Sequence, residues 1–125
     1  MTLTPLASSN TSTILDPGFP VQLIGAATAK VSSGVFCVQN GGILNITALN
    51  TGSPTTITAT LERSTDGVTF NADPNQVSTD FLDNPEQSIP NIAPGYLYQL
   101  VLSTLSGGSS PAVTFNASLD RRGLS

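Results

Sequence analysis

Acidic side chains are the residues of this chain best suited to chemistry. Six of the eight lie within one segment; they are Glu62, Asp66, Asp73, Asp80, Asp83 and Glu86. Loop carboxylates bind Ca²⁺ where several stand close together. Here the spacing is wide, and Asp66, Asp73 and Asp83 occupy positions where a short acidic side chain bonds its own backbone. The pattern therefore predicts turns rather than a metal site, and we expect no cofactor.

Paired carboxylates also hydrolyse glycosides, usually in a cleft lined by aromatic rings. The chain has five Phe, two Tyr and no Trp, and most of these rings fall at core-facing positions of expected strands. It has no His, and no phosphate-binding loop or nucleophile motif is visible. Cys37 is the one cysteine, and its apolar neighbours predict a buried small side chain. We therefore expect that the protein is not an enzyme.

The charge pattern argues against nucleic acid as a partner. Net charge is −4, and the cations are limited to Lys30, Arg63, Arg121 and Arg122. Phosphate binding needs a basic stripe, which these four positions do not form. Charged residues make up only 10% of the chain, against about 25% in typical soluble domains. Such a neutral, polar surface suits a protein that packs against neighbours.

The chain shows neither a membrane-spanning apolar run nor a secretory signal. We therefore expect no membrane partner and synthesis in a cytoplasm. A length of 125 residues fits one domain.

Alternation of apolar and polar residues is the main structural signal. In Thr55–Arg63 the apolar side chains are Ile57, Ala59 and Leu61, and a tight turn at Ser64–Gly67 leads into Val68–Phe70. Comparable strands are expected at Val21–Ile24, Val35–Gln39, Ile43–Asn50, Val77–Leu82, Gln87–Ile92, Tyr96–Leu105 and Ala112–Leu119. Seven or eight strands separated by Gly, Pro and Asn turns predict an all-β fold, an antiparallel β-sandwich or short barrel.

Turn residues and prolines refine this arrangement. Asn40–Gly42 favours a hairpin turn, and Ser106–Ser110 is expected to be a flexible hairpin loop. Pro90 cannot donate to a ladder, so Gln87–Ile92 is expected at a sheet edge or as an extended crossing. Both faces of Tyr96–Leu105 are apolar, which predicts a central strand.

Residues 1–20 are expected to form an extended arm, 21–119 the sandwich domain and 120–125 a short tail. The arm is either a disordered terminus or a segment that lies along a neighbouring subunit. Its apolar residues are the candidate contacts: Leu3, Leu6, Ile14, Leu15 and Phe19. Tyr96 is a further candidate, because Tyr is enriched at interfaces. For Tyr98 we favour a ring at the end of the core with its hydroxyl toward water.

The segment Leu61–Ser64, followed by Thr65–Phe70, resembles the "LQRS-DGGTTW" segment of small β-sandwich proteins in tailed-bacteriophage virions. The strand after Pro94–Gly95, reading YLYQLV, resembles their later "PG-LYRL-V" strand. The likeness covers about residues 35–119. It departs from the pattern at Phe70, which replaces Trp, and at Gln99, which replaces Arg.

The resemblance implies a structural virion protein of the capsid decoration, or cement, type. Its partners would then be the major capsid protein and copies of itself, as a homotrimer on the capsid surface after synthesis in the host bacterial cytoplasm. Two alternatives remain: a tail or tail-fibre module, and a carbohydrate-binding sandwich. The last needs an exposed aromatic platform or a polar cleft.

Overall fold

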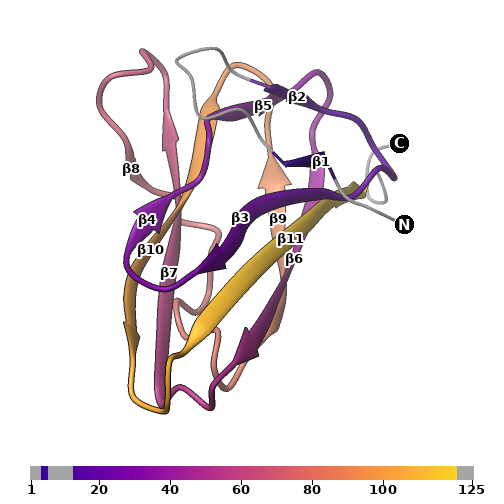
Figure 1. Ribbon diagram of the computed structural model, residues 1–125. Helices are drawn as coiled ribbons and strands as arrows, with labels where there is room; N and C mark the ends of the chain where they lie inside the picture. The colour runs from indigo at the N-terminus through magenta and orange to yellow at the C-terminus, as the bar shows by residue number, and fades with distance from the viewer. Residues whose placement is uncertain (1–3, 6–12, 121–125) are drawn as a thin grey trace.

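The structure, a computed structural model, describes residues 4–5 and 13–120 and consists of two β-sheets packed face to face (Figure 1). The described part contains no helix, so the predicted all-β sandwich is confirmed. Its strands are β1 (Thr4–Pro5), β2 (Thr13–Leu15), β3 (Val21–Ala27), β4 (Val31–Ser32), β5 (Phe36–Val38), β6 (Gly42–Thr51), β7 (Thr56–Ser64), β8 (Asn71–Ala72), β9 (Glu86–Ile92), β10 (Leu97–Ser106) and β11 (Ala112–Asp120).

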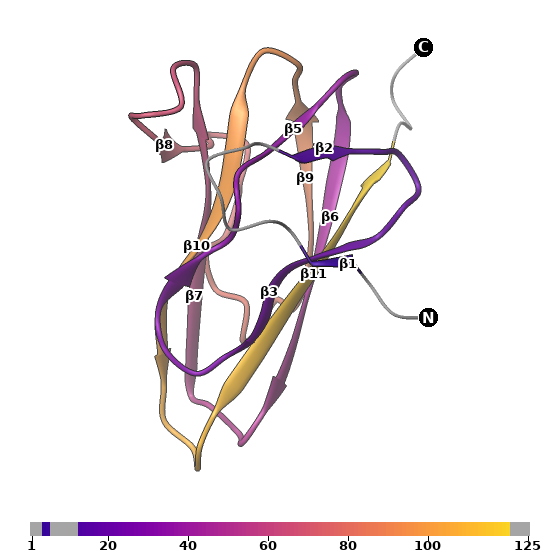
Figure 2. The ribbon, with the colours of Figure 1, turned by 45° about the horizontal axis from the view of Figure 1, so that its top comes forward.

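The first sheet has the strand order β1-β3-β11-β6-β9, and the second has β2-β5-β10-β7-β8, with β4 also paired to β10. Figure 2 shows β7 and β10 on one side of the molecule and β6 and β11 on the other. The long strands pair antiparallel, whereas β1 with β3 and β2 with β5 pair parallel. The two longest ladders, β7 with β10 and β6 with β11, therefore form the centre of the sandwich.

The core follows the alternation that the sequence shows. Ile57, Ala59 and Leu61 of β7 are fully buried, as predicted. One face of each other long strand is buried too, with these residues: Leu44, Ile46, Ala48, Tyr98, Leu100, Leu102, Val113, Phe115, Ala117 and Leu119. Two aromatic pairs lie in the core, one of them edge-to-face between Phe81 and Phe115 with centroids 5.2 Å apart. Burial of these apolar side chains supplies the main driving force for the fold.

Two turns expected to close hairpins instead connect the sheets, so that part of the prediction is wrong. Asn40–Gly42 leads from β5 in the second sheet to β6 in the first, and residues 107–111 lead from β10 to β11 in the same sense. Ser109 N of the second of these loops donates to Gly52 O over 2.8 Å, so this loop is bonded to the connection between β6 and β7. A turn sequence specifies local backbone geometry, but it does not specify which sheet the next strand joins.

The segment after β7 also differs from the prediction. Val77–Leu82 does not form a strand, apart from an isolated bridge between Thr58 and Asp80. Instead the chain lies along the free edge of β7 in irregular form, with backbone bonds from Ala59 N to Thr79 O (3.0 Å) and from Phe81 N to Ile57 O (3.0 Å). Val77 is 98% exposed, so this segment lacks the inward alternation of a strand.

The predicted positions of two strands within their sheets are confirmed. β9, which contains Pro90, lies at the edge of the first sheet, where a missing N–H leaves no ladder bond unmade. β10 lies in the middle of the second sheet between β5 and β7.

The N-terminal segment adds a strand to each sheet. The prediction gave residues 1–20 no regular structure, whereas Thr4 and Pro5 pair with Val21 and Gln22, and Thr13–Leu15 pairs with Phe36–Val38. Further along the same segment, Pro17 forms an isolated parallel bridge with Leu119 of β11. Residues 1–3 and 6–12, and 121–125 of the predicted tail, lie outside the described residues.

Candidate functional site

The predicted contact residues of the N-terminal segment have different environments. Ile14 is 47% exposed and Phe19 is 69% exposed, so both present apolar surface. Leu15, in contrast, is 3% exposed and packs in the core of its own chain. Leu3 and Leu6 lie outside the described residues. Of the predicted set within the described segment, Ile14 and Phe19 are therefore available to a neighbour.

Phe19 is held at the surface by a backbone turn against the end of β11. Gly18 N donates to Leu119 O over 2.9 Å, and Phe19 N donates to Asp16 O over 3.3 Å. Gly18 has a φ of +81°, a conformation that favours glycine. The turn fixes the backbone that carries the exposed ring.

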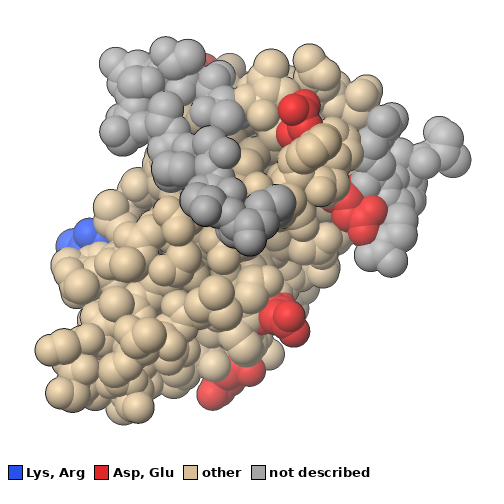
Figure 3. All heavy atoms as spheres, turned by 45° about the vertical axis from the view of Figure 1, so that its right-hand side comes forward, with Lys and Arg blue, Asp and Glu red and all other residues tan. Residues whose placement is uncertain are grey.

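The middle of the outer face of β6 and β11 is a surface that sequence reasoning did not identify. Its side chains carry no charge, although Asp120 continues the outward register of β11 and Glu86 of β9 pairs with Thr47. Six outward side chains form it in three cross-strand pairs, and we call them the uncharged face: Asn45 with Ser118, Thr47 with Asn116, and Leu49 with Thr114. Leu49 is 57% exposed. In Figure 3, which turns the side of β6, β9 and β11 forward, a broad tan surface has its acidic atoms along one side. The face therefore offers hydroxyl, amide and methyl groups.

Several polar groups of the uncharged face are already fixed within the chain. Ser88 Oγ donates to Asn45 Oδ1 over 2.6 Å, and Ala26 N donates to Thr114 Oγ1 over 2.9 Å. Asn116 Oδ1 is buried and accepts no hydrogen bond from the described residues. In the sequence, the residues of this face are those that alternate with the buried apolar residues of Ile43–Asn50 and Ala112–Leu119. The cross-strand register that joins the two halves is not visible in sequence.

A second candidate lies at the end of the sandwich beyond β7. An open depression of about 500 Å³ is lined by Arg63, Ser64, Thr65, Asp66, Thr69, Asn71, Ala72, Pro74 and Tyr96. Arg63 follows the inward register of Ile57, Ala59 and Leu61, which brings its side chain to the open end of the core. Its guanidinium carbon lies 4.5 Å from the centroid of the Tyr96 ring, a cation–π contact. The predicted candidate Tyr96 is thus half-buried and covered on one side.

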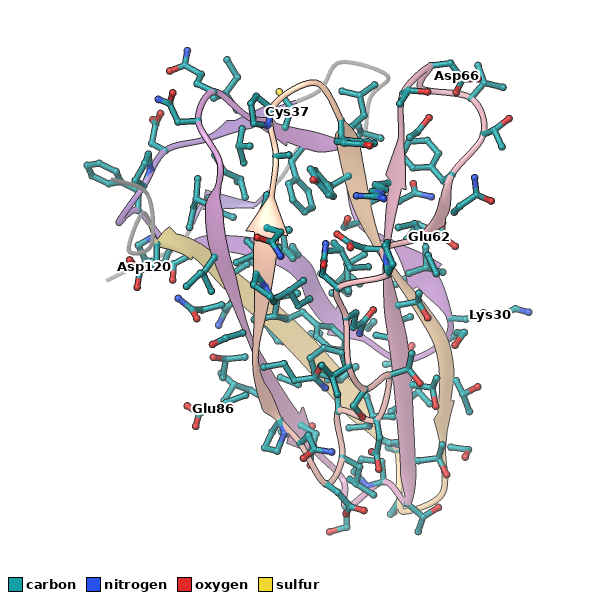
Figure 4. The ribbon with its side chains drawn as sticks, turned by 180° about the vertical axis from the view of Figure 1, so that it is seen from behind. Lys30, Cys37, Glu62, Asp66, Glu86 and Asp120 are labelled. Carbon is teal, nitrogen blue, oxygen red and sulfur yellow. The ribbon has the colours of Figure 1, made fainter. Side chains whose placement is uncertain are left out.

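The loop wall of this depression is built by Ser64 and Asp66. Ser64 Oγ accepts from Gly67 N (2.9 Å) and donates to Asp66 Oδ1 (2.8 Å). Asp66 Oδ1 also accepts from the backbone N–H groups of Val68 (2.8 Å) and Thr69 (2.9 Å). The bonds from Thr69, Val68 and Ser64 favour the charged form and lower the pKa of Asp66 to about 2. Figure 4 places Asp66 in the loop at one end of the molecule.

Behind this wall, Tyr98 differs from its prediction. Its ring is fully buried, and its hydroxyl accepts from Ala93 N over 2.9 Å rather than facing water. Burial raises the pKa of this hydroxyl. The ring centroid lies 5.8 Å from that of Phe36 in a stacked arrangement, and 6.2 Å from that of Tyr96. Tyr98 is therefore a structural residue that supports Tyr96 from within.

Acidic residues bond the backbone of turns, as predicted, except that Asp80 does so in place of Asp83. Asp66 and Asp73 bond backbone N–H groups two residues on, the latter at Asn75 over 2.8 Å. Asp80, rather than Asp83, does the same for Leu82 and Asp83. Asp73 is almost fully buried, and its Oδ2 has no hydrogen-bond partner among the described residues. Within residues 4–5 and 13–120 no group of three His, Cys, Asp or Glu could hold a metal ion.

Cys37 is half-buried rather than fully buried, which corrects the prediction. Phe36 and Val38 take the inward positions of β5, so the thiol side chain faces outward. The described residues include no apolar helix of the length that a membrane crossing requires.

No family model matches this sequence. No curated protein matches it significantly either.

Proposed function

We propose that this chain is a structural protein of a tailed-phage virion that binds the assembled capsid as a decoration protein. The observation that carries the proposal is the uncharged face. The cores of protein interfaces are depleted in charged residues, and charges at their centre are costly to desolvate. The paired Asn, Thr and Ser side chains, with Leu49 at one end, carry no charge themselves, and the carboxylates of Glu86 and Asp120 border them.

The position of the face also suits binding. It lies on β6 and β11, two of the longest strands, whose opposite sides pack into the core. A rigid surface loses little conformational entropy on association. The exposed rings and methyls of Phe19 and Ile14 offer apolar contacts from the N-terminal segment.

The proposed mechanism is mass action. A protein that binds the assembled shell, and not its dispersed subunits, stabilises the shell by about 2.7 kcal/mol per site at 100 times its Kd. The partners in this proposal are the major capsid protein and copies of this chain. The homotrimer and the location on the capsid surface come from the family resemblance, by analogy. A tail module is the competing proposal.

Copy number in purified particles tests the proposal. Quantitative mass spectrometry of particles of the virus that encodes the chain should give on the order of hundreds of copies, scaled to the major capsid protein. A few copies per particle would favour the tail, and absence from particles would overturn both. Light scattering of the isolated protein tests the trimer.

A pair of matched variants tests the face itself. Thr47→Lys introduces a long charged side chain into the uncharged face, across from Glu86 of β9, and Thr60→Lys does so on the outer side of the second sheet. Both residues are half-buried threonines in the middle of a long strand. We expect Thr47→Lys to reduce occupancy on particles at least tenfold, and Thr60→Lys to bind as the unaltered protein does. Equal occupancy of the two variants would rule out this face as the contact.

A further inference from the structure

The depression at Arg63 and Tyr96 has hydrogen-bonding capacity that the fold does not use. Arg63 forms no hydrogen bond or ion pair with any residue in 4–5 or 13–120, so its five N–H donors remain available there. The described residues donate only to Oδ1 of Asp66, which leaves Oδ2 as an acceptor. Asn71 is exposed beside them and adds an amide.

The geometry of these groups is fixed before any ligand arrives. Ser64 and Asp66 lock the loop through four bonds to backbone N–H groups, at 2.8 to 3.2 Å. Arg63 is held against the Tyr96 ring, which itself leans on the buried ring of Tyr98. A preformed set of polar groups binds with a smaller loss of conformational entropy than a mobile set.

The balance of charge indicates the class of ligand. One guanidinium and one ionised carboxylate line the same depression, so a free anion meets Asp66 and a free cation meets Arg63. A neutral molecule with adjacent hydroxyl groups can accept from Arg63 and donate to Asp66 Oδ2, with Thr65, Thr69 and Asn71 within the same lining. A volume of about 500 Å³ lies within the usual range of ligand sites, about 300 to 1,000 Å³.

We propose that this depression binds a neutral saccharide, with Arg63 as donor and Asp66 as acceptor. This activity is independent of attachment through the uncharged face, which lies on the other sheet. The site is open, and Arg63 already occupies one face of the Tyr96 ring. Binding of a single sugar unit is therefore weak, with a Kd on the order of 1 mM.

Nuclear magnetic resonance titration of the full chain tests the proposal. The probes are glucose, galactose, mannose and N-acetylglucosamine, with glucuronate and glucosamine as charged counterparts. At least one neutral sugar should shift the backbone amides of residues 64–72, while those of Thr114 and Asn116 stay in place. No shift in 64–72 with any neutral sugar up to about 100 mM, roughly a hundredfold above the expected Kd, would overturn the proposal. A glucuronate or glucosamine Kd tenfold below that of every neutral sugar would also overturn it.

Variants separate the site from the fold. Arg63→Gln and Asn71→Ala should each raise the Kd at least fivefold. Asn71 is exposed, so its replacement leaves the core intact even if Arg63→Gln disturbs it. Lys30→Gln removes a positive charge from the loop after β3, outside the depression, and should leave the Kd unchanged. If Asn71→Ala binds as tightly as the unaltered chain, or Lys30→Gln weakens binding equally, the proposal is wrong.

Discussion

The side-chain carbonyl of Gln76 accepts a hydrogen bond from the backbone N–H of Leu61 over 2.8 Å, in the place where a neighbouring strand would stand. The amide nitrogen of the same side chain donates to Ala59 O (3.1 Å) and to Ser78 O (2.9 Å). One glutamine thus replaces a peptide unit along the edge of β7. It satisfies backbone groups that the irregular segment after β8 leaves open.

Replacing Gln76 should therefore be costly. Gln76→Ala leaves the N–H of Leu61 and the carbonyl of Ala59 without partners, which should lower the free energy of unfolding by about 1 to 3 kcal/mol. Urea unfolding followed by circular dichroism measures it. Gln99→Ala is the matched control, because among the described residues the Gln99 side chain bonds only the Glu62 side chain (2.9 Å), and it should cost less than about 1 kcal/mol. Equal costs for the two variants would contradict the role of Gln76.

The two tyrosines at the start of β10 should respond differently to loss of a hydroxyl. Tyr98→Phe leaves Ala93 N without its acceptor inside the sandwich and should destabilise the fold by about 1 to 2 kcal/mol. Tyr96→Phe removes a hydroxyl with no partner among the described residues, so its effect should stay within about 0.5 kcal/mol. Thermal unfolding by calorimetry compares them, and a larger loss for Tyr96→Phe would refute this account.

Asp66 should contribute to acid sensitivity. Its pKa is lowered from 3.8 to about 2 in the fold, so the folded state favours the ionised form. That contribution is present above pH 3.8 and is lost as pH falls toward 2. The melting temperature of Asp66→Asn should therefore fall less over this range than that of the unaltered chain. Asp83→Asn, which removes an exposed carboxylate in another turn, should follow the unaltered chain. Parallel curves for all three proteins would exclude the contribution of Asp66.

Packing should distinguish a core leucine from an apolar residue outside the core. Leu100 of β10 is fully buried, and Leu100→Ala should lower stability by about 2 to 5 kcal/mol through the cavity it leaves. Val77 is almost fully exposed, and Val77→Ala should change stability by less than about 0.5 kcal/mol. Chemical denaturation of both variants provides the test. A substantial loss with Val77→Ala would mean that this segment packs more tightly than the structure indicates.

Alternation in sequence was sufficient to predict the long strands and their inward faces. Thr55–Arg63 and Ala112–Leu119 were predicted to within one residue at each end, because buried and half-buried positions alternate along most of β7 and all of β11. Alternation does not reveal the partner of a strand. It therefore could not show that Asn40–Gly42 crosses between sheets, or that Thr13–Leu15 pairs with β5 in parallel.

The candidate sites were predicted only in part for the same reason. Tyr96 and Phe19 were identified from residue type and position. Arg63 carried a signal, since it continues the inward register of β7, but its contact with Tyr96 depends on the alignment of β7 with β10. The uncharged face likewise exists only through the alignment of β6 with β11.

Both edge strands of the first sheet contain proline, Pro5 in β1 and Pro90 in β9, and Asn91 next to the latter has a φ of +61°. An incoming strand at Pro90 finds no N–H donor and a backbone that turns out of the extended conformation. These edges therefore disfavour the addition of strands from other copies, and with it the formation of fibres. Copies crowded at high local density would remain discrete particles rather than merge into one continuous sheet.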